Sequence, residues 1–335
     1  MASNDFSKEL HLAEIAVQKA VLVTKKVLQL VAKGEHTKKD NTSVSLADFA
    51  AQALLVAAIH SNFPDDTIIS EEDTALLREK PGLAAKVWNL VDATRLDDAD
   101  SEAFLHSPKS QEETLQSINR GGQGFGGSKG RVWFIDPADG TKGFLNQGRY
   151  VVCVILMVDG EEKMAAFGCP HLDVEAGKLS ESDVHLDGPG YLISAIRGQG
   201  ARIRPLGKGI LEPSWLLPRL DEQPNTASLR FCENTKTTTP QFADVGFSDI
   251  VLPTPLPGDP PAHIWDHAGG IMLFEEVGGK VTDLNGKPLL LTTGRDLTEN
   301  FGFIAAPASI HARVVEAAKK VFADYPEYSQ IITQV

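Results

Sequence analysis

Residues 133–144, with the sequence WFIDPADGTKGF, place two aspartates three positions apart in front of a turn. Asp136 and Asp139 are separated by Pro-Ala and are followed by Gly140 and Thr141. An aspartate followed by glycine lets the chain reverse sharply and leaves backbone N–H groups beside the carboxylates. Carboxylate oxygens are the ligands that Mg²⁺ prefers, and phosphate oxygens commonly complete its coordination. The pattern favours a site in which divalent cations hold a phosphate; the alternative is an Asx-type turn that caps a helix.

Acidic side chains also stand at three other points where a strand or a helix is expected to end or begin. Asp48 is expected to open a helix, where its charge could simply favour the helix N-terminus. A β-branched strand over 67–69 is expected to end in three adjacent acids, the first of them Glu71, which are either solvated or neutralised by cations. Asp266 precedes a predicted helix whose first N–H groups would lie near whatever this carboxylate binds. The adjacent His267 is more typical of packing than of a ligand.

The elements that must position these acids follow from hydrophobic patterning. Apolar residues at helical spacing predict a first helix over 6–34, and the run at 132–135 predicts a buried strand that Pro137 ends. Further helices are expected over 48–63, 76–91, 267–277 and 309–324, and further strands over 150–158, 163–169, 191–196, 202–205, 228–232, 280–282, 288–292 and 302–305. Alternating strands and helices predict a layered α/β architecture. A boundary near 160–170 is expected to separate an N-terminal domain, 1–165, from a C-terminal domain, 166–335.

The glycine-rich stretch 121–130 is expected to be a flexible loop beside the site, with a weak indication that Lys129 helps to bind an anion. It lacks the residue order of a P-loop, and no dinucleotide fingerprint falls between a strand and a helix. An oxidoreductase therefore has little support.

The amino-acid composition limits the kinds of molecule that the protein is expected to bind. The chain has 335 residues, 42% of them hydrophobic, and a formal net charge of −13. Such an acidic surface repels nucleic-acid backbones, so a small phosphorylated substrate is expected and a nucleic-acid polymer is not. No apolar run long enough to span a membrane and no secretory leader is visible, so a soluble cytoplasmic protein, monomeric or dimeric, is the expectation. Three unpaired cysteines suit a reducing compartment.

Specific strings strengthen the interpretation of the scattered acids. DFAAQ, FIDPADGTKGFL, GCPHL, IWDHAGG and EEVGGKVTD together resemble the inositol monophosphatase-like superfamily, and within it the fungal and plant 3′(2′),5′-bisphosphate nucleotidases. The resemblance runs from about residue 7 to residue 324. It implies the five-layer αβαβα sandwich of that superfamily, a Mg²⁺-dependent phosphomonoesterase with two to three ions, and inhibition by Li⁺.

The resemblance also implies roles for individual residues. Glu71, Asp136 and the carbonyl of Ala138 would hold one Mg²⁺, and Asp136, Asp139 and Asp266 would hold a second. A third, weaker ion would lie near Glu71 and Asp48. Thr141, paired with Asp48, would orient and help to deprotonate the attacking water, and the N–H groups of Gly140 and Thr141 would contact the phosphate.

Two departures from the family pattern bear on the substrate. Ser70 stands where the family usually has glycine. The segment before Trp265 is short and lacks a Ser–Lys string, with Pro253 in the place of an expected arginine and Lys236 as the only Lys or Arg between Arg230 and Lys280. The first candidate substrate is 3′-phosphoadenosine 5′-phosphate. The alternatives are a different phosphomonoester, such as an inositol or sugar phosphate or a specialised-pathway intermediate, and a non-catalytic protein that binds a phosphorylated ligand.

Overall fold

The structure is a computed structural model, and it divides into two compact units, Met1–Leu216 and Leu217–Val335. It describes residues 5–32, 42–140, 143–144, 146, 148–174, 186, 188–220, 231–232, 250–251 and 261–323. The domain boundary predicted at 165/166 falls inside a strand of the first unit's sheet, so the division between the units lies further along the chain.

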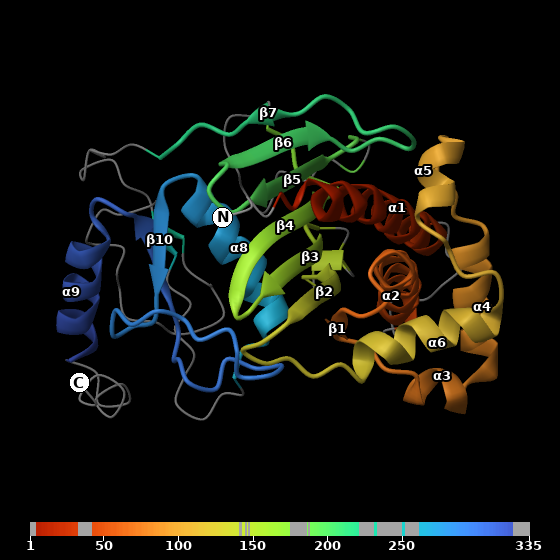
Figure 1. Cartoon of the computed structure of the whole chain (residues 1–335), viewed down its shortest axis with the longest axis horizontal. Helices are drawn as coiled ribbons and strands as arrows, with labels where there is room; N and C mark the ends of the chain where they lie inside the picture. Colours follow the sequence, from red (N-terminus) through yellow and green to blue (C-terminus); the bar gives the residue numbers. More distant parts are fainter. Residues whose placement is uncertain are drawn as a thin grey trace. The chain divides into compact units, whose positions relative to one another are not determined.

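The first unit is built on a seven-stranded sheet (Figure 1). Its strands, in spatial and sequence order, are β1 Thr67–Ser70, β2 Arg131–Asp139, β3 Val151–Val158, β4 Glu161–Cys169, β5 Tyr191–Ile196, β6 Ala201–Pro205 and β7 Trp215–Leu216. From β2 to β7 each strand pairs antiparallel with the next, whereas β1 pairs with β2 in parallel. The predicted hairpin over 150–169 is therefore confirmed, with its turn at Asp159 and Gly160.

Helices cover this sheet and join β1 to β2. They are α1 Ser7–Ala32, α2 Thr42–Asn62, α3 Ala75–Glu79, α4 Pro81–Asp92, α5 Ala99–Phe104 and α6 Gln111–Gly122. α1 packs on β3, β4 and β5, while α2 packs on β1 and β2 and is itself covered by α4 and α6. The four helices between β1 and β2 supply the long crossover that a parallel pair of strands requires.

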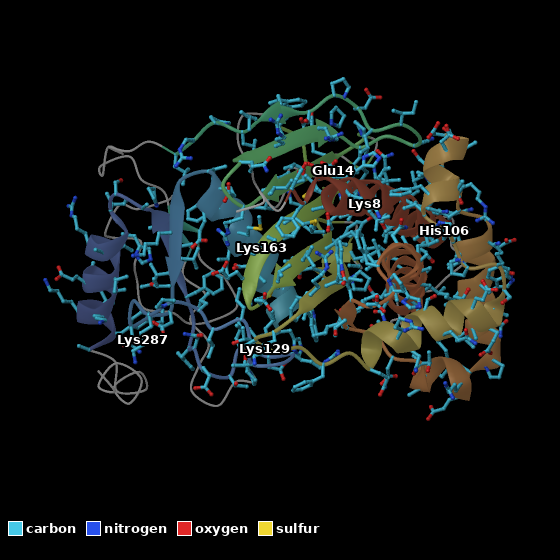
Figure 2. All side chains as sticks on the ribbon, in the orientation of Figure 1. Lys8, Glu14, His106, Lys129, Lys163 and Lys287 are labelled. Carbon is cyan, nitrogen blue, oxygen red and sulfur yellow. The ribbon has the colours of Figure 1, made fainter. Side chains whose placement is uncertain are left out.

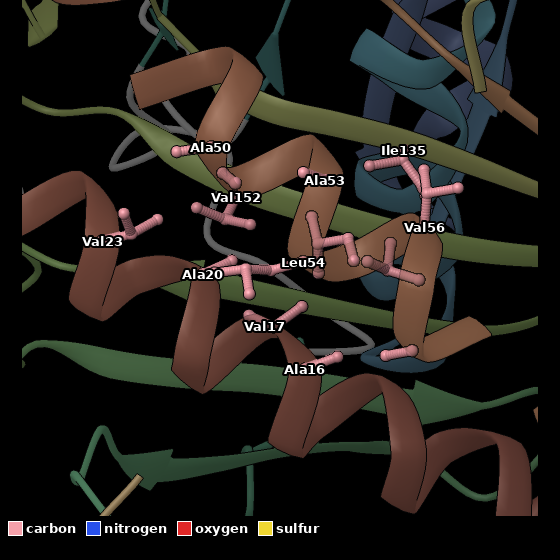
Figure 3. Packing of buried hydrophobic residues seen from close by; sticks show 14 of the residues in the cluster. Ala16, Val17, Ala20, Val23, Ala50, Ala53, Leu54, Val56, Ile135 and Val152 are labelled. Atoms are coloured by element: carbon pink, nitrogen blue, oxygen red, sulfur yellow. The ribbon is translucent and has the colours of Figure 1, made fainter. Parts of the chain in front are cut away.

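The core of the first unit lies where α1 and α2 meet each other and the sheet (Figure 3). Small residues at this crossing, Ala16 and Ala20 on α1 and Ala50 and Ala53 on α2, are 2% exposed or less. Because alanine projects only a methyl group, the two helices can approach closely while larger residues such as Leu54 fill the remaining space. Close packing of α2 on β2 therefore fixes the position of the polar residues of α2 relative to the ends of the strands.

The second unit carries a four-stranded sheet in the order β10-β11-β9-β8. Its described elements are β8 Phe231–Cys232, β9 Ile250–Val251, α8 Ile264–Glu276, β10 Gly279–Thr282, β11 Ile304–Pro307 and α9 His311–Phe322. α8 packs on β10 and α9 packs on β11, and Figure 1 shows β10 between the two helices. The strand predicted over 288–292 is wrong, because Leu290 donates its backbone N–H to the side chain of Asn300 in a loop.

Three element boundaries also differ from expectation. α2 begins at Thr42 rather than at Asp48, so Asp48 lies in the second turn and does not interact with free N–H groups at the helix start. α8 begins at Ile264, which places Asp266 inside its first turn. β2 continues past Pro137 to Asp139.

Two further observations concern membrane spans and cysteines. Within the described residues, no helix is both long and apolar enough to cross a membrane. Cys153 is buried and Cys169 is half-buried, and neither forms a disulfide; the side chain of Cys232 lies outside the described residues.

Candidate active site

The C-terminal ends of β1 and β2 bring two of the predicted acids to one edge of the sheet. In this parallel pair Ser70 lies opposite Ile135, so the next residues along the two strands are Glu71 and Asp136. Parallel strands end at the same edge, and consecutive strands lie about 4.8 Å apart. The backbone therefore places Glu71 and Asp136 as neighbours, although they are far apart in sequence.

A β-bulge in β2 lies between two of the predicted acids, Asp136 and Asp139. Asp136 pairs with Cys153 and Asp139 pairs with Val151, so two residues of β2, Pro137 and Ala138, oppose a single residue of β3. A bulge leaves one residue unpaired, which tolerates the missing N–H of proline. This is why the strand continues where the sequence predicted its end.

The bulge also orients Asp136. Its side chain is 2% exposed, and its Oδ1 accepts a hydrogen bond of 3.1 Å from the N–H of Ala138. Asp139 and the carbonyl of Ala138 lie in the same stretch of β2 as Asp136. Three oxygen donors therefore come from four consecutive residues.

Asp48 faces the same strand end from α2. Its side chain is 4% exposed, and its Oδ1 is buried without a hydrogen-bond partner. Burial, reinforced by the negative charges of Glu72 and Glu71, raises the pKa of Asp48 well above its ordinary value. A buried carboxylate oxygen close to like charges is unfavourable unless a proton or a cation compensates for it.

Glu72 shows the same effect of crowded acids. Burial, followed by the charges of Glu71 and Asp73, raises the pKa of Glu72 from 4.5 to about 7. A carboxyl whose pKa is raised by folding costs stability at high pH, and the cost fades as the pH falls from 7 to 4.5. We therefore expect Glu72→Gln to raise the Tm of the metal-free protein at pH 8 by more than at pH 5, as measured by thermal unfolding in EDTA. An equal shift at the two pH values would contradict this account.

Two glycines at the end of α6 and just after it, Gly122 and Gly124, are packed against the backbone of residues 68–72. A Cβ on Gly122 would overlap the carbonyl oxygen of Glu72, and a Cβ on Gly124 would overlap the carbonyl oxygen of Ile68. Glycine at these two positions lets the end of α6 approach the backbone of β1. The sequence identified the glycine-rich stretch, but it could not predict which backbone atoms these two glycines contact.

Lys129 does not lie beside the acids. Lys129, which is labelled in Figure 2, is exposed and precedes Arg131, the first residue of β2. Asp136 is close to the other end of that strand. At about 3.3 Å per residue, five residues of strand separate the two ends by roughly 16 Å. The predicted anion-binding role of Lys129 at this site is therefore wrong.

The remaining predicted residues are placed as follows. Gly140 has a φ of +94°, a conformation that favours glycine, and its carbonyl accepts a hydrogen bond from Phe144. Thr141 lies outside the described residues.

In the second unit, Asp266 occupies the first turn of α8, and His267 packs edge-on against Phe303. Burial lowers the pKa of His267, in keeping with the packing role expected for it.

The donor set fits a hard divalent cation, although the described side chains do not enclose one. Carboxylates and a backbone carbonyl are the oxygen ligands that Mg²⁺ takes, and the orphaned Oδ1 of Asp48 lacks the partner that a cation would provide. Within the part of the chain that the structure describes, no three His, Cys, Asp or Glu side chains are grouped closely enough to hold a metal ion. The ligand set as a whole, with Asp266 from the second unit, stays a prediction.

Comparisons with known proteins extend over nearly the whole chain. The chain is 38% identical to a 3′(2′),5′-bisphosphate nucleotidase of Emericella nidulans, over 94% of this chain and 99% of that protein. It is 34% identical to a 3′(2′),5′-bisphosphate nucleotidase of Schizosaccharomyces pombe, over 97% of this chain and 99% of that protein. A 3′,5′-bisphosphate nucleotidase 2 of Arabidopsis thaliana is 26% identical over 94% of this chain and 97% of its own length.

Solved structures show the same fold. Inositol monophosphatase-II of Staphylococcus aureus superposes with a TM-score of 0.56 at 16% identity, covering 97% of this chain and 100% of its own. Inositol monophosphatase from Anabaena superposes with a TM-score of 0.54 at 19% identity, covering 98% of this chain and 100% of its own. The predicted α/β sandwich of this superfamily is thus confirmed. Since residues 7–230 and 246–322 match the inositol monophosphatase family, the chain belongs to that family.

Proposed function

We propose that this protein is a Mg²⁺-dependent phosphomonoesterase whose first candidate substrate is 3′-phosphoadenosine 5′-phosphate. The observation that carries the proposal is the edge shared by β1 and β2, where Glu71 and Asp136 are neighbours and the buried Asp48 has an orphaned oxygen. The bisphosphate nucleotidases to which the chain is 34–38% identical support the choice of substrate.

Each part of the proposed site has a defined task. Glu71, Asp136, Asp139, Asp266 and the carbonyl of Ala138 would hold the metal, for which we propose two to three Mg²⁺ ions. Bound magnesium supplies positive charge that neutralises the phosphate and lowers the pKa of water. Gly140 and Thr141 would direct their N–H groups at the phosphate oxygens.

Asp48 and Thr141 would handle the proton of the attacking water. Asp48 is buried beside the acidic strand end, which suits a general base that would work through the Thr141 hydroxyl once bound metal offsets the neighbouring acids. Water attack on phosphorus releases the alcohol and inorganic phosphate. No cysteine or serine nucleophile is required in this scheme.

A second candidate is a phosphatase of the same fold that acts on a different phosphomonoester. The family match is interrupted at residues 231–245, within the segment that the family resemblance in the sequence predicts to be shortened. The alignment with the Emericella nidulans protein spans 348 positions, more than the 335 residues of this chain, so that relative contains residues that this chain lacks. Arginine and lysine pair strongly with phosphate, and their scarcity here would weaken binding of a second phosphate. Pro253 and Lys236 lie outside the described residues.

A phosphate-release assay tests the proposal and separates the two candidates. We expect the purified chain to hydrolyse members of a panel of nucleotide, inositol and sugar phosphates with Mg²⁺, to stop in EDTA, and to be inhibited by millimolar Li⁺. If the shortened segment has weakened recognition, 3′-phosphoadenosine 5′-phosphate will show a high KM, and another phosphate of the panel will have a larger kcat/KM. Absence of release from every compound would refute the enzyme, and binding of a phosphorylated compound without release would identify a non-catalytic relative.

A further inference from the structure

Gln52 makes an unusually complete set of hydrogen bonds beside the acidic strand end. Its side chain is fully buried on α2 and uses both donors and both acceptors of the amide. Oε1 accepts from the Ser70 hydroxyl at 2.6 Å and from the N–H of Glu72 at 3.0 Å. Nε2 donates to the carbonyl of Glu72 at 2.6 Å and to the carbonyl of Ile118 in α6 at 3.0 Å.

These bonds extend the pairing of β1 beyond its last residue. In the part of the chain that the structure describes, β1 is the edge strand of its sheet and has a neighbouring strand only on the β2 side. The amide of Gln52 binds both the N–H and the C=O of Glu72, as an adjacent strand would. Together with the bond to Ser70, these contacts fix the residues on both sides of Glu71 to the same side chain.

Gln52 is also one helical turn from Asp48 on α2, because positions i and i+4 lie on the same helix face. α2 therefore presents Asp48 and Gln52 together to the end of β1. The glycines at the end of α6 leave the room that this arrangement needs: a Cβ on Gly121 would lie 2.9 Å from the Cβ of Ser70 and 3.2 Å from the Nε2 of Gln52.

We propose that Gln52 is a positioning residue for the metal ligand Glu71, acting through the backbone of residues 70–72, and that Ser70 strengthens this role. This inference rests on the proposed function, since Glu71 is a ligand only if the chain binds Mg²⁺. Ser70 is the residue that departs from the family's usual glycine, and its hydroxyl supplies a bond to Gln52 that glycine cannot make. Groups that orient metal ligands typically change metal affinity by about 10- to 100-fold when they are removed.

The test compares two buried glutamines in the full-length chain. Gln52→Met keeps a side chain of similar size and removes all four hydrogen bonds. Gln18→Met is the matched control, because Gln18 is 1% exposed on α1 and bridges the N–H of Gly207 and the carbonyl of Gly209, contacts that involve no predicted ligand. Mg²⁺ binding is measured by titration calorimetry without substrate, and Tm, kcat and KM are measured on the same samples.

We expect both substitutions to lower the Tm, but only Gln52→Met to weaken Mg²⁺ binding, by about tenfold or more. Its kcat at fixed Mg²⁺ should fall with little change in KM, and excess Mg²⁺ should restore part of the activity. Ser70→Ala removes one of the four bonds and keeps the Cβ, so a smaller loss, roughly two- to tenfold in Mg²⁺ affinity, is expected.

The outcomes separate this inference from the proposed function. A wild-type chain that binds no Mg²⁺ would refute the metal site and the positioning role together. If the wild-type chain binds Mg²⁺ and Gln52→Met binds it equally well, only the positioning role is refuted. Should Gln52→Met fail to fold, Ser70→Ala decides, because wild-type Mg²⁺ affinity in that variant contradicts the proposal.

Discussion

Replacing Asp136 by asparagine is expected to abolish turnover while the protein stays folded. Asparagine has nearly the same shape as aspartate and keeps an oxygen that can accept the N–H of Ala138. It removes a negative charge that would hold Mg²⁺, and metal stabilisation of a phosphoryl transition state is worth several kcal/mol. We therefore expect kcat to fall by about a thousandfold or more in the phosphate-release assay, with the Tm near or above that of the wild type.

A second aspartate supplies the control for this prediction. Asp98 caps α5, where its Oδ2 accepts the N–H of Ser101 at 2.8 Å, and asparagine caps helices equally well. Asp98→Asn should therefore keep both the fold and the activity despite the same loss of charge. Full activity of Asp136→Asn, with Asp98→Asn also active, would refute the assignment of Asp136 as a metal ligand.

The largest expected loss of stability comes from adding one methyl group to Gly124. A Cβ at this position would overlap the carbonyl oxygen of Ile68 in β1, and backbone cannot move aside as a flexible side chain can. Overpacking of this kind costs about 1–3 kcal/mol and occasionally more. Gly124→Ala should consequently lower the free energy of unfolding by at least that amount and, by displacing β1, reduce activity as well.

The same glycine-rich stretch contains a matched control for Gly124→Ala. A Cβ on Gly127 has no atom within 4 Å, so Gly127→Ala should leave stability and activity close to those of the wild type. Chemical denaturation with urea gives the free energies of unfolding for both variants. If the two substitutions have equal effects, the close packing of Gly124 on β1 is not what constrains this stretch.

The elements that the sequence predicted well are those whose burial leaves a local pattern. β3 is a continuous apolar run, and β5 was predicted with its observed bounds because its residues and its flanking turns are distinctive. The start of α2 was misplaced because three of its first four residues, Thr42, Ser43 and Ser45, carry hydroxyl groups and are more typical of caps and turns than of a helix interior. The false strand over 288–292 was an apolar run that the chain uses in a loop, with Leu290 47% exposed.

The sequence predicted which acidic residues form the candidate site, but it did not predict how they and their supporting residues are arranged in space. The strings around Asp136 and Asp266 are local and specific, so the sequence alone identified them. Gln52 left no comparable signal, because its partners Glu72 and Ile118 are 20 and 66 positions away. The β-bulge was also missed, since proline in a strand ordinarily indicates an end, and only pairing with β3 shows that the strand goes on.

The mixture of pairings in the seven-stranded sheet has a consequence for how the chain folds. β2 to β7 pair in sequence order, whereas β1 must return to β2 across four helices. Pairings between segments close in the chain lose little loop entropy and form quickly, while distant pairings form late. Glu71 should thus reach Asp136 only after the meander has condensed, so that recovery of catalytic activity during refolding lags behind recovery of most β-structure.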